Sequence, residues 1–234
     1  MALIANMVGR NEANRYLVGV LGRLQSFVDR ICFTDDASDD ATPTLAELFG
    51  ADVEQTNRCL FAQDEHLLRT IAWRHLERLA RAGDWVLAID CDEVFHGQAR
   101  LPALLDRADL DVLAVTLFNM WNETQVRVDG HWHPSFLYRL FRFYPGGEFA
   151  DQKLACGSAP SYVHQAIDAG RSLSDTGLVI QHFGYASPGD KLSKYRRYIE
   201  LDGGRYHPLA QLRSILDPTP TLVDWNGATL DSTP

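Results

Sequence analysis

Apolar residues in the first part of the chain alternate between short runs and stretches with helical spacing. Four strands are predicted, at residues 3–8, 31–34, 52–55 and 85–89. Three helices are predicted between them, at residues 12–27, 42–49 and 66–82. Strands that alternate with helices in this order indicate βα units and a mostly parallel sheet flanked by helices.

The second part of the chain has a different pattern. Further strands are predicted at residues 113–121, 125–128, 136–144 and 179–181. No long helix separates the first three, which favours a mixed sheet in this half. Ser187 and Pro188 predict the start of a helix that runs to about Leu201, after a glycine- and serine-rich stretch at residues 146–161. We expect the Pro- and Thr-rich tail from Asp217 to wrap the surface.

Composition narrows the class of protein. A chain of 234 residues with 46% hydrophobic and 23% charged residues is typical of one globular domain spanning residues 1–234. The net charge of −9 and pI near 5.3 disfavour general binding to nucleic acid or to an anionic membrane. Because the sequence contains neither a signal peptide nor an integral membrane segment by pattern, we expect a cytoplasmic protein.

The cysteines predict neither a zinc cluster nor a disulfide framework. Cys32, Cys59, Cys91 and Cys156 lie far apart and form no C-x-x-C pair. We therefore expect free thiols, most of them buried on strands or in the core.

The most informative segment is an apolar run that ends in acids, Trp85-Val86-Leu87-Ala88-Ile89-Asp90-Cys91-Asp92-Glu93. Carboxylates at the carboxyl end of a strand lie in the ligand-binding crevice of an open α/β sheet, and their oxygens suit Mg²⁺ or Mn²⁺. Such a metal would neutralise a departing diphosphate. The alternative is that these acids end the strand and cap a following helix.

A second acidic segment follows the next predicted strand, in Phe33-Thr34-Asp35-Asp36-Ala37-Ser38-Asp39-Asp40. We expect it to meet the first acidic segment across the crevice, where a carboxylate can accept hydrogen bonds from a ribose hydroxyl or a base imino group. The alternative is a solvated turn with Ser38 or Asp39 as a helix cap, an alternative that weighs more for Asp39 and Asp40 than for Asp35 and Asp36.

Taken together, these motifs resemble the inverting family 2 glycosyltransferases of the GT-A fold. The resemblance rests on motifs in matching order over residues 3–202: Arg10-Asn11-Glu12, Asp35-Asp36-Ala37-Ser38-Asp39, Gly83-Asp84-Trp85 before Asp90-Cys91-Asp92-Glu93, and His182-Phe183-Gly184-Tyr185 followed by Lys191 and Lys194. It implies a GT-A-like α/β fold in which residues 1–110 bind the nucleotide sugar and residues 111–234 bind the acceptor.

The resemblance also implies roles for particular residues. It places four side chains in the nucleoside pocket: Glu12, Asp35, Asp36 and Arg69. Asp90 and Asp92 would bind the ribose and the metal diphosphate, with His182 completing a site for Mn²⁺ or Mg²⁺. Lys191, Lys194 or the amino end of the late helix would meet the diphosphate oxygens. For Arg69 an exposed position on an amphipathic helix is the alternative, and for His182 a structural histidine bonded to a backbone carbonyl.

The segment that would carry the general base matches the family less well than the other motifs. Inverting transfer needs a carboxylate that takes the proton of the attacking acceptor. Relatives often carry Val-His-Glu where this chain has Val163-His164-Gln165, and Gln165 cannot act as a base. The nearest acids are Asp151, which we favour, and Glu148, and solvated loop positions are the alternative for both. His164 could act instead, with a hydrogen-bonded structural histidine as its alternative.

The function expected from the sequence is metal-dependent transfer of a sugar, with inversion, from a nucleotide-sugar donor to an unidentified acceptor hydroxyl. We expect a UDP-sugar, ahead of GDP- or dTDP-sugars. Aromatic and amide groups at 119–122, 131–133 and 224–226 are suited to an acceptor sugar or to core and turn positions. The rivals are a nucleotidylyltransferase, which the absence of a glycine-rich phosphate loop with a lysine disfavours, and a non-catalytic nucleotide-sugar binding protein.

Overall fold

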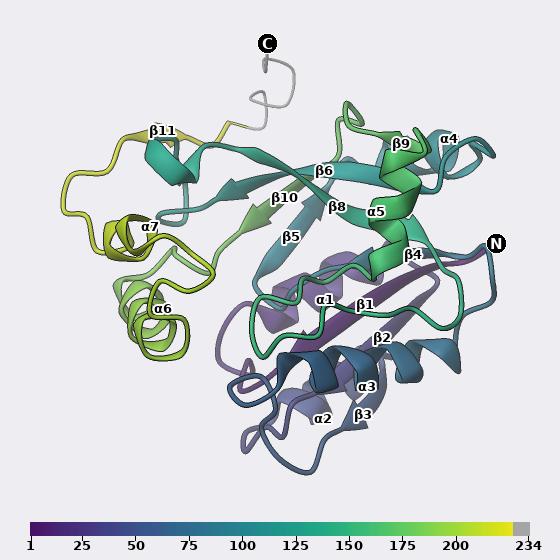
Figure 1. Cartoon of the computed structure of the whole chain (residues 1–234), viewed down its shortest axis with the longest axis horizontal. Coiled ribbons are helices and arrows are strands. Elements are labelled where there is room, and N and C mark those ends of the chain that lie inside the picture. The colour runs from purple at the N-terminus through teal and green to yellow at the C-terminus, as the bar shows by residue number, and fades with distance from the viewer. Residues whose placement is uncertain (227–234) are drawn as a thin grey trace.

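A mixed sheet runs through the molecule (Figure 1). The computed structural model describes residues 1–226. Within them the strand order is β3-β2-β1-β4-β8-β6-β10-β5, with β9 beside β6. The strands are β1 (Leu3–Gly9), β2 (Arg30–Asp35), β3 (Asp52–Gln55), β4 (Trp85–Ala88), β5 (Glu93–His96), β6 (Val112–Asn119), β8 (Ser135–Arg142), β9 (Ser172–Leu173) and β10 (Val179–His182).

The two halves of the sheet differ in strand direction. In the first half β3, β2, β1 and β4 are all parallel to one another. Beyond β4 the sheet is mixed, because β8 is antiparallel to both β4 and β6, while β10 is parallel to β6 and antiparallel to β5. This arrangement confirms the expected α/β class and the mixed second half.

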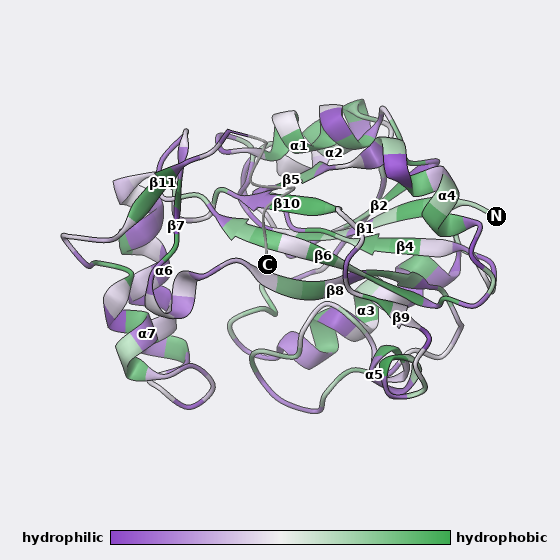
Figure 2. Cartoon of the chain, turned by 90° about the horizontal axis from the view of Figure 1, so that it is seen from above, coloured by the Kyte–Doolittle hydropathy of each residue, from purple (hydrophilic) through white to green (hydrophobic). Residues whose placement is uncertain are grey.

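Helices cover both faces of the sheet, as Figure 2 shows. One face carries α1 (Leu17–Leu24), α2 (Thr42–Leu48) and α4 (Leu101–Leu105), and the other carries α3 (Glu65–Glu77) and α5 (Ser161–Asp168). Side chains of β4 alternate between the two cores, with Trp85 and Leu87 on the α1 side and Val86 and Ala88 on the α3 side. Burial on both faces explains why β4 is a continuous apolar run.

The C-terminal part of the described chain forms a separate layer at one end of the sheet (Figures 1 and 2). It contains a ribbon of β7 (Gln125–Arg127) and β11 (Leu222–Asp224), the helices α6 (Pro188–Leu201) and α7 (Leu209–Ser214), and the short turn η2 (Gly130–Trp132). The other short turn, η1 (Gln98–Arg100), leads into α4. Its core is aromatic: Trp121, Trp132 and Tyr185 pack with Ile215. The predicted tail thus folds back as β11, and its residues 227–234 lie outside the described part.

Two predicted helices are shorter in the structure. The helix expected at 12–27 begins only at Leu17, because Asn11 has a φ of 56° and the N–H of Glu12 donates to Thr42 Oγ1 instead of entering a helix. The helix expected at 66–82 begins at Glu65 and ends at Glu77, after which the chain turns toward β4. The elements β5, α4, α5, α7 and β9 were not predicted.

Other expectations concern the thiols and the membrane. All four cysteines are free, and Cys32, Cys91 and Cys156 are buried, as predicted. Within residues 1–226, no helix has both the length and the apolar character needed to cross a bilayer. The cytoplasmic location and the division at about residue 110 stay predictions.

Candidate active site

Asp90 and Asp92 lie in the tight turn that joins β4 to β5. The backbone N–H of Asp90 donates to Glu93 Oε2 at 2.8 Å, which closes the turn. A side chain at Gly9 would come within 2.6 Å of Cys91 Sγ, so the glycine lets the end of β1 approach this turn. Because β5 follows and not a helix, the helix-capping alternative for these acids is wrong.

Arg139 of β8 pairs with the carboxylates at the two ends of this turn, Asp90 and Glu93. Its Nη2 lies 3.3 Å from Asp90 Oδ2 and 3.1 Å from Glu93 Oε1. Burial raises the pKa of Glu93 to about 8, although the charge of Arg139 opposes that rise. Burial would also raise the pKa of Asp90, but the charges of Arg139 and Arg69 outweigh it and lower that pKa. Asp90 is therefore an anion held by two arginines.

Asp92 meets His182 and Lys194 on the other side of the turn. Asp92 Oδ1 is 3.6 Å from His182 Nε2, and Asp92 Oδ2 is 3.4 Å from Lys194 Nζ. Burial alone would raise the pKa of Asp92, yet the charge of Lys194 holds it well below its ordinary value. The antiparallel register of β10 and β5, with His182 opposite Glu93, brings the late histidine to this turn.

The orientation of His182 is fixed by Asn119 at the end of β6. His182 Nδ1 lies 2.8 Å from Asn119 Oδ1, an oxygen that can only accept, so Nδ1 carries the proton and Nε2 has a free lone pair. Burial and the charge of Lys194 lower the pKa of His182, which keeps the ring neutral. The partner is a side-chain amide, not the backbone carbonyl of the structural alternative.

Glu12 enters the same cluster through Arg15. Both oxygens of Glu12 accept from Arg15 Nη1 at 2.8 Å, and Arg15 Nη2 lies 2.8 Å from Asp190 and 3.9 Å from Asp92. Burial, and more weakly the charge of Asp92, raises the pKa of Glu12 to about 7 although Arg15 opposes that rise. Asp190 belongs to the first turn of α6, where Ser187 caps the helix. Arg15 therefore joins the loop after β1 to the start of α6.

Asp35 and Asp36 are buried and hydrogen-bonded within the protein. Asp35 accepts from Ser38 and from Gln55 Nε2 at 2.9 Å. Asp36 accepts from the backbone N–H groups of Leu60, at 2.7 Å, and of the next residue, at 3.0 Å. Each carboxylate is 1% exposed or less. In this structure they shape the loops around the predicted nucleoside pocket and present no free oxygen to it.

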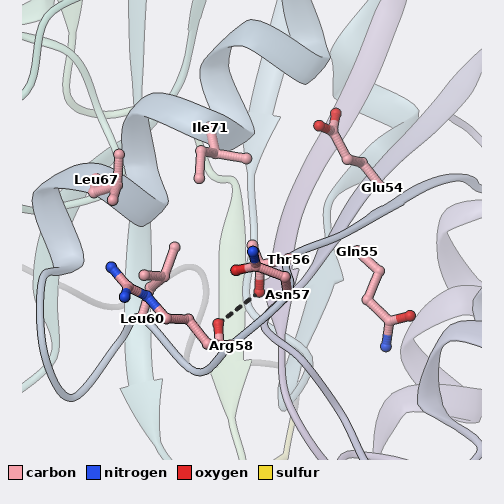
Figure 3. Close-up of a pocket in the computed structure, with 8 residues that line it drawn as sticks. All are labelled: Glu54, Gln55, Thr56, Asn57, Arg58, Leu60, Leu67 and Ile71. Atoms are coloured by element: carbon pink, nitrogen blue, oxygen red, sulfur yellow. Dashed lines mark hydrogen bonds between the residues drawn. The ribbon is translucent and has the colours of Figure 1, made fainter.

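The loop held by Asp36 forms one wall of a groove of about 680 Å³ (Figure 3). Its other wall is a face of α3, from which Leu67 and Ile71 project. Thr56 donates to the carbonyl of Arg58 at 2.9 Å across the turn of this loop. The full lining is Glu54, Gln55, Thr56, Asn57, Arg58, Leu60, Leu67 and Ile71.

Two predicted basic residues have different positions. Arg69 is largely buried and pairs with Glu65 Oε1 at 3.0 Å, and its charge reaches Asp90, so the exposed-helix alternative is wrong. Lys191 is directed away from the acids: its Nζ donates to the carbonyl of Trp121 at 2.8 Å and lies 5.1 Å from the indole ring. One turn later, Lys194, the other lysine expected to meet the diphosphate, lies beside Asp92.

The candidate bases lie outside the charged cluster. Asp151 and Glu148 are exposed in the loop between β8 and α5, and His164 is exposed on α5. Among residues 1–226, no hydrogen bond or ion pair joins the carboxylate of Asp151 or Glu148 to another group. The same loop does reach the cluster further along, where Arg139 donates to Ser158 Oγ at 2.7 Å.

The residues at the turn provide metal ligands of a suitable kind, but not an assembled site. Two carboxylates and a neutral imidazole with a free Nε2 suit Mn²⁺ better than Mg²⁺. Across the described residues, however, no three His, Cys, Asp or Glu side chains are grouped to hold a metal ion. The reason is visible in the contacts: Asp90 is directed toward Arg139, and the Lys194 ammonium lies between Asp92 and His182.

Sequence reasoning missed three cluster residues. Arg15 carried a weak signal, three residues after Glu12, and Arg139 carried a stronger one, as a lone charge within the apolar strand Leu137 to Phe141. Asn119 was considered only for the acceptor. For Arg139 and Asn119 the missing information was the strand pairing that brings the residue to the turn, and for Arg15 it was the course of the loop between β1 and α1.

Comparison with known proteins identifies the family. The sequence profile of glycosyl transferase family 2 matches residues 10–166, and no curated protein sequence matches the chain. Among solved structures, the mannosyltransferase PcManGT from Pyrobaculum calidifontis, in complex with GDP-Man and Mn²⁺, has a TM-score of 0.55 at 13% identity, over 94% of this chain and 66% of that one.

A second structural relative is residues 1–349 of TarS from S. aureus in complex with UDP, with a TM-score of 0.50 at 16% identity, over 92% of this chain and 70% of that one. The chain spans only 42% of a longer TarS structure. These likenesses confirm the fold, and the profile match covers most of the chain. The protein therefore belongs to glycosyl transferase family 2 and has the GT-A fold.

Proposed function

We propose that the protein transfers a sugar from a UDP-sugar to an acceptor hydroxyl, with inversion and with the help of Mn²⁺ or Mg²⁺. The observation that carries this proposal is the meeting of Asp90, Asp92 and His182 with Arg15 and Lys194 where β1, β4 and β10 end. Acidic and basic groups that converge at such strand ends suit a metal-bound diphosphate. Family membership removes the nucleotidylyltransferase alternative.

The donor fits along the ends of the parallel strands. Glu12 and Arg69, with the loops shaped by Asp35 and Asp36, form the surface on which we place the nucleoside. UDP in the TarS complex supports a uridine donor, whereas the GDP-Man in the PcManGT complex makes guanosine the main competitor. Loops fixed by buried carboxylates are preorganised, so little ordering free energy opposes binding.

The chain's own residues would act on the diphosphate in two ways. Asp92 and His182, with Asp90, would hold the metal, which when bound supplies positive charge to the leaving diphosphate. Arg15 and Lys194 lie beside Asp92 and can donate to phosphate oxygens that approach it. Because these donors are fixed before the donor arrives, they stabilise developing negative charge without reorganisation.

The acceptor would be deprotonated from the loop between β8 and α5. Asp151 remains the proposed base and Glu148 the second choice, since neither carboxylate has a partner among residues 1–226 and Ser158 of the same loop contacts Arg139. The proton of the acceptor hydroxyl passes to the carboxylate as the oxygen attacks the anomeric carbon from the face opposite the diphosphate. The bond to the diphosphate breaks in the same step.

The test is metal-dependent binding of the nucleotide part of the donor. Calorimetry with UDP and GDP, with Mn²⁺ or with EDTA, should show metal-dependent binding of UDP, and Asp92→Asn should remove the dependence because an anionic ligand is lost while shape is kept. Asp109→Asn, at an exposed surface pair, is the control. Equal binding of UDP in Mn²⁺ and in EDTA, with a silent Asp92→Asn, would overturn the metal-diphosphate assignment.

A further inference from the structure

Lys194 is a buried cation at the centre of the acidic cluster. Its residue is 9% exposed, and its Nζ lies 2.8 Å from His182 Nε2 and 3.4 Å from Asp92 Oδ2. The ammonium also lies 4.6 Å from the ring of Tyr185, in the geometry of a cation–π contact. An anion, a lone pair and an aromatic face therefore all surround the one ammonium.

The backbone at Gly184 lies against the three charged and polar groups. A side chain at Gly184 would come within 1.9 Å of Lys194 Nζ, 2.5 Å of His182 Nε2 and 2.6 Å of Asp92 Oδ2. All three groups therefore pack directly on the bare Cα of Gly184. Asn119 holds the imidazole so that its Nε2 lone pair is directed at the ammonium, as it would be at a metal ion.

From these contacts, and resting on the proposed function, we propose that Lys194 is a built-in competitor of the divalent metal: its ammonium occupies the cation position between Asp92 and His182. A metal can bind these two ligands only after Nζ has left that position, because two cations cannot share the same carboxylate oxygen and lone pair at close range. Lys194 thus sets the metal affinity of the donor-free protein. The displaced ammonium stays close enough to bind an incoming diphosphate.

The arrangement gives a reason for coupling between the metal and the donor. Without a donor, displacing Lys194 leaves a buried ammonium without its anionic partner, which opposes metal binding. With a diphosphate present, the ammonium finds new acceptor oxygens, and the opposition disappears. Metal and nucleotide should therefore each strengthen the binding of the other, as thermodynamic linkage requires.

The experiment titrates the full chain with Mn²⁺ alone and measures free Mn²⁺ by electron paramagnetic resonance. Lys194→Met should raise the affinity for Mn²⁺ about tenfold or more, since the competing charge is removed. Lys194→Gln, which keeps a polar group beside Asp92, is the second variant if the methionine form does not fold. Arg196→Met removes the same charge from an exposed position on the same helix and should leave the affinity unchanged.

Unchanged or weaker Mn²⁺ binding in a folded Lys194→Met or Lys194→Gln protein would overturn the proposal, and so would an equal gain in Arg196→Met. A UDP titration of the wild-type protein with Mn²⁺ separates this result from the proposed function. If UDP binding depends on metal but the Lys194 variants bind Mn²⁺ as wild type does, the competitor proposal fails and the proposed function stands. If the Lys194 variants bind Mn²⁺ more tightly but UDP does not bind, the proposed UDP-sugar donor is wrong and the competitor proposal stands.

Discussion

Replacing Arg139 with methionine removes the cation that holds the turn between β4 and β5. Its side chain is 14% exposed, Glu93 is 1% exposed and Asp90 is 38% exposed. Breaking a buried ion pair typically costs about 3–5 kcal/mol of unfolding free energy, because an uncompensated charge remains inside. The exposed part of Asp90 is screened by solvent and adds little, so near pH 8.5, where Glu93 is ionised beside Arg139, we expect about 3 kcal/mol, mainly from Glu93.

The loss should depend on pH through Glu93. Its pKa is about 8 in the folded protein and 4.5 ordinarily, so the protonated form stabilises the fold at low pH and that contribution is lost as pH rises toward 8. Arg139 limits this loss by pairing with the anion. The difference between wild type and Arg139→Met should therefore be largest near pH 8.5 and smaller near pH 5.5, where Glu93 is neutral in both proteins.

Urea denaturation followed by circular dichroism at the two pH values measures the difference. Arg107→Met is the control, since Arg107 pairs with Asp109 on an exposed surface, and it should change stability little at either pH. A loss in Arg139→Met that is equal at both pH values would refute the assignment to Glu93. A loss no greater than that of Arg107→Met would show that the turn does not depend on the arginine.

Three further predictions test separate features. Asp151→Asn should lower transfer to acceptor about 10²–10⁴-fold with unchanged donor affinity; wild-type turnover would move the role to another residue. His182→Ala should weaken Mn²⁺-supported UDP binding. Asn119→Leu removes the partner that orients the His182 ring and should lower the Mn²⁺ affinity, measured by calorimetry, about 10–100-fold. Normal affinity in both variants would make His182 a structural residue. Burial lowers the pKa of His96, so the stability that the neutral ring gives above about pH 6.5 is lost on acidification. His96→Gln should therefore lose less melting temperature than wild type between pH 7 and pH 5. An equal loss in both proteins would show that His96 does not cause the acid sensitivity.

The central strands could be predicted because their residues are buried on both faces. A short, continuous apolar run such as β4 has few structural alternatives to a buried strand in a chain of this composition. The strand β5 could not be predicted, since Glu93–His96 has only four residues and no alternation of polar and apolar positions. It is defined by its pairing with β10, more than 80 positions away in the chain. Short helices such as α4 and α7 have too few turns to show periodicity.

The candidate site was predictable where a strand end and a charge coincide, as at Asp90, Asp92 and His182. The choice between Lys191 and Lys194 was not, because residues three apart lie on neighbouring faces of a helix and the rotation of α6 decides which one faces the acids. That rotation is set by the ties of Asp190 to Arg15 and Tyr16, contacts between residues about 175 positions apart.

The failed prediction of a helix from residue 12 coincides with the charged cluster, and the two have a common cause. The loop before α1 is held out of helical geometry by Asn11, whose N–H donates to Ser38 Oγ, and by Glu12, whose N–H donates to Thr42 Oγ1. This loop keeps Glu12 next to the end of β1 and lets Arg15 span from it to Asp190. Local sequence preference is overruled where the chain positions charges for a ligand, which is where such failures are expected. Restoring helical preference with Asn11→Ala should therefore weaken UDP binding more than it changes the melting temperature.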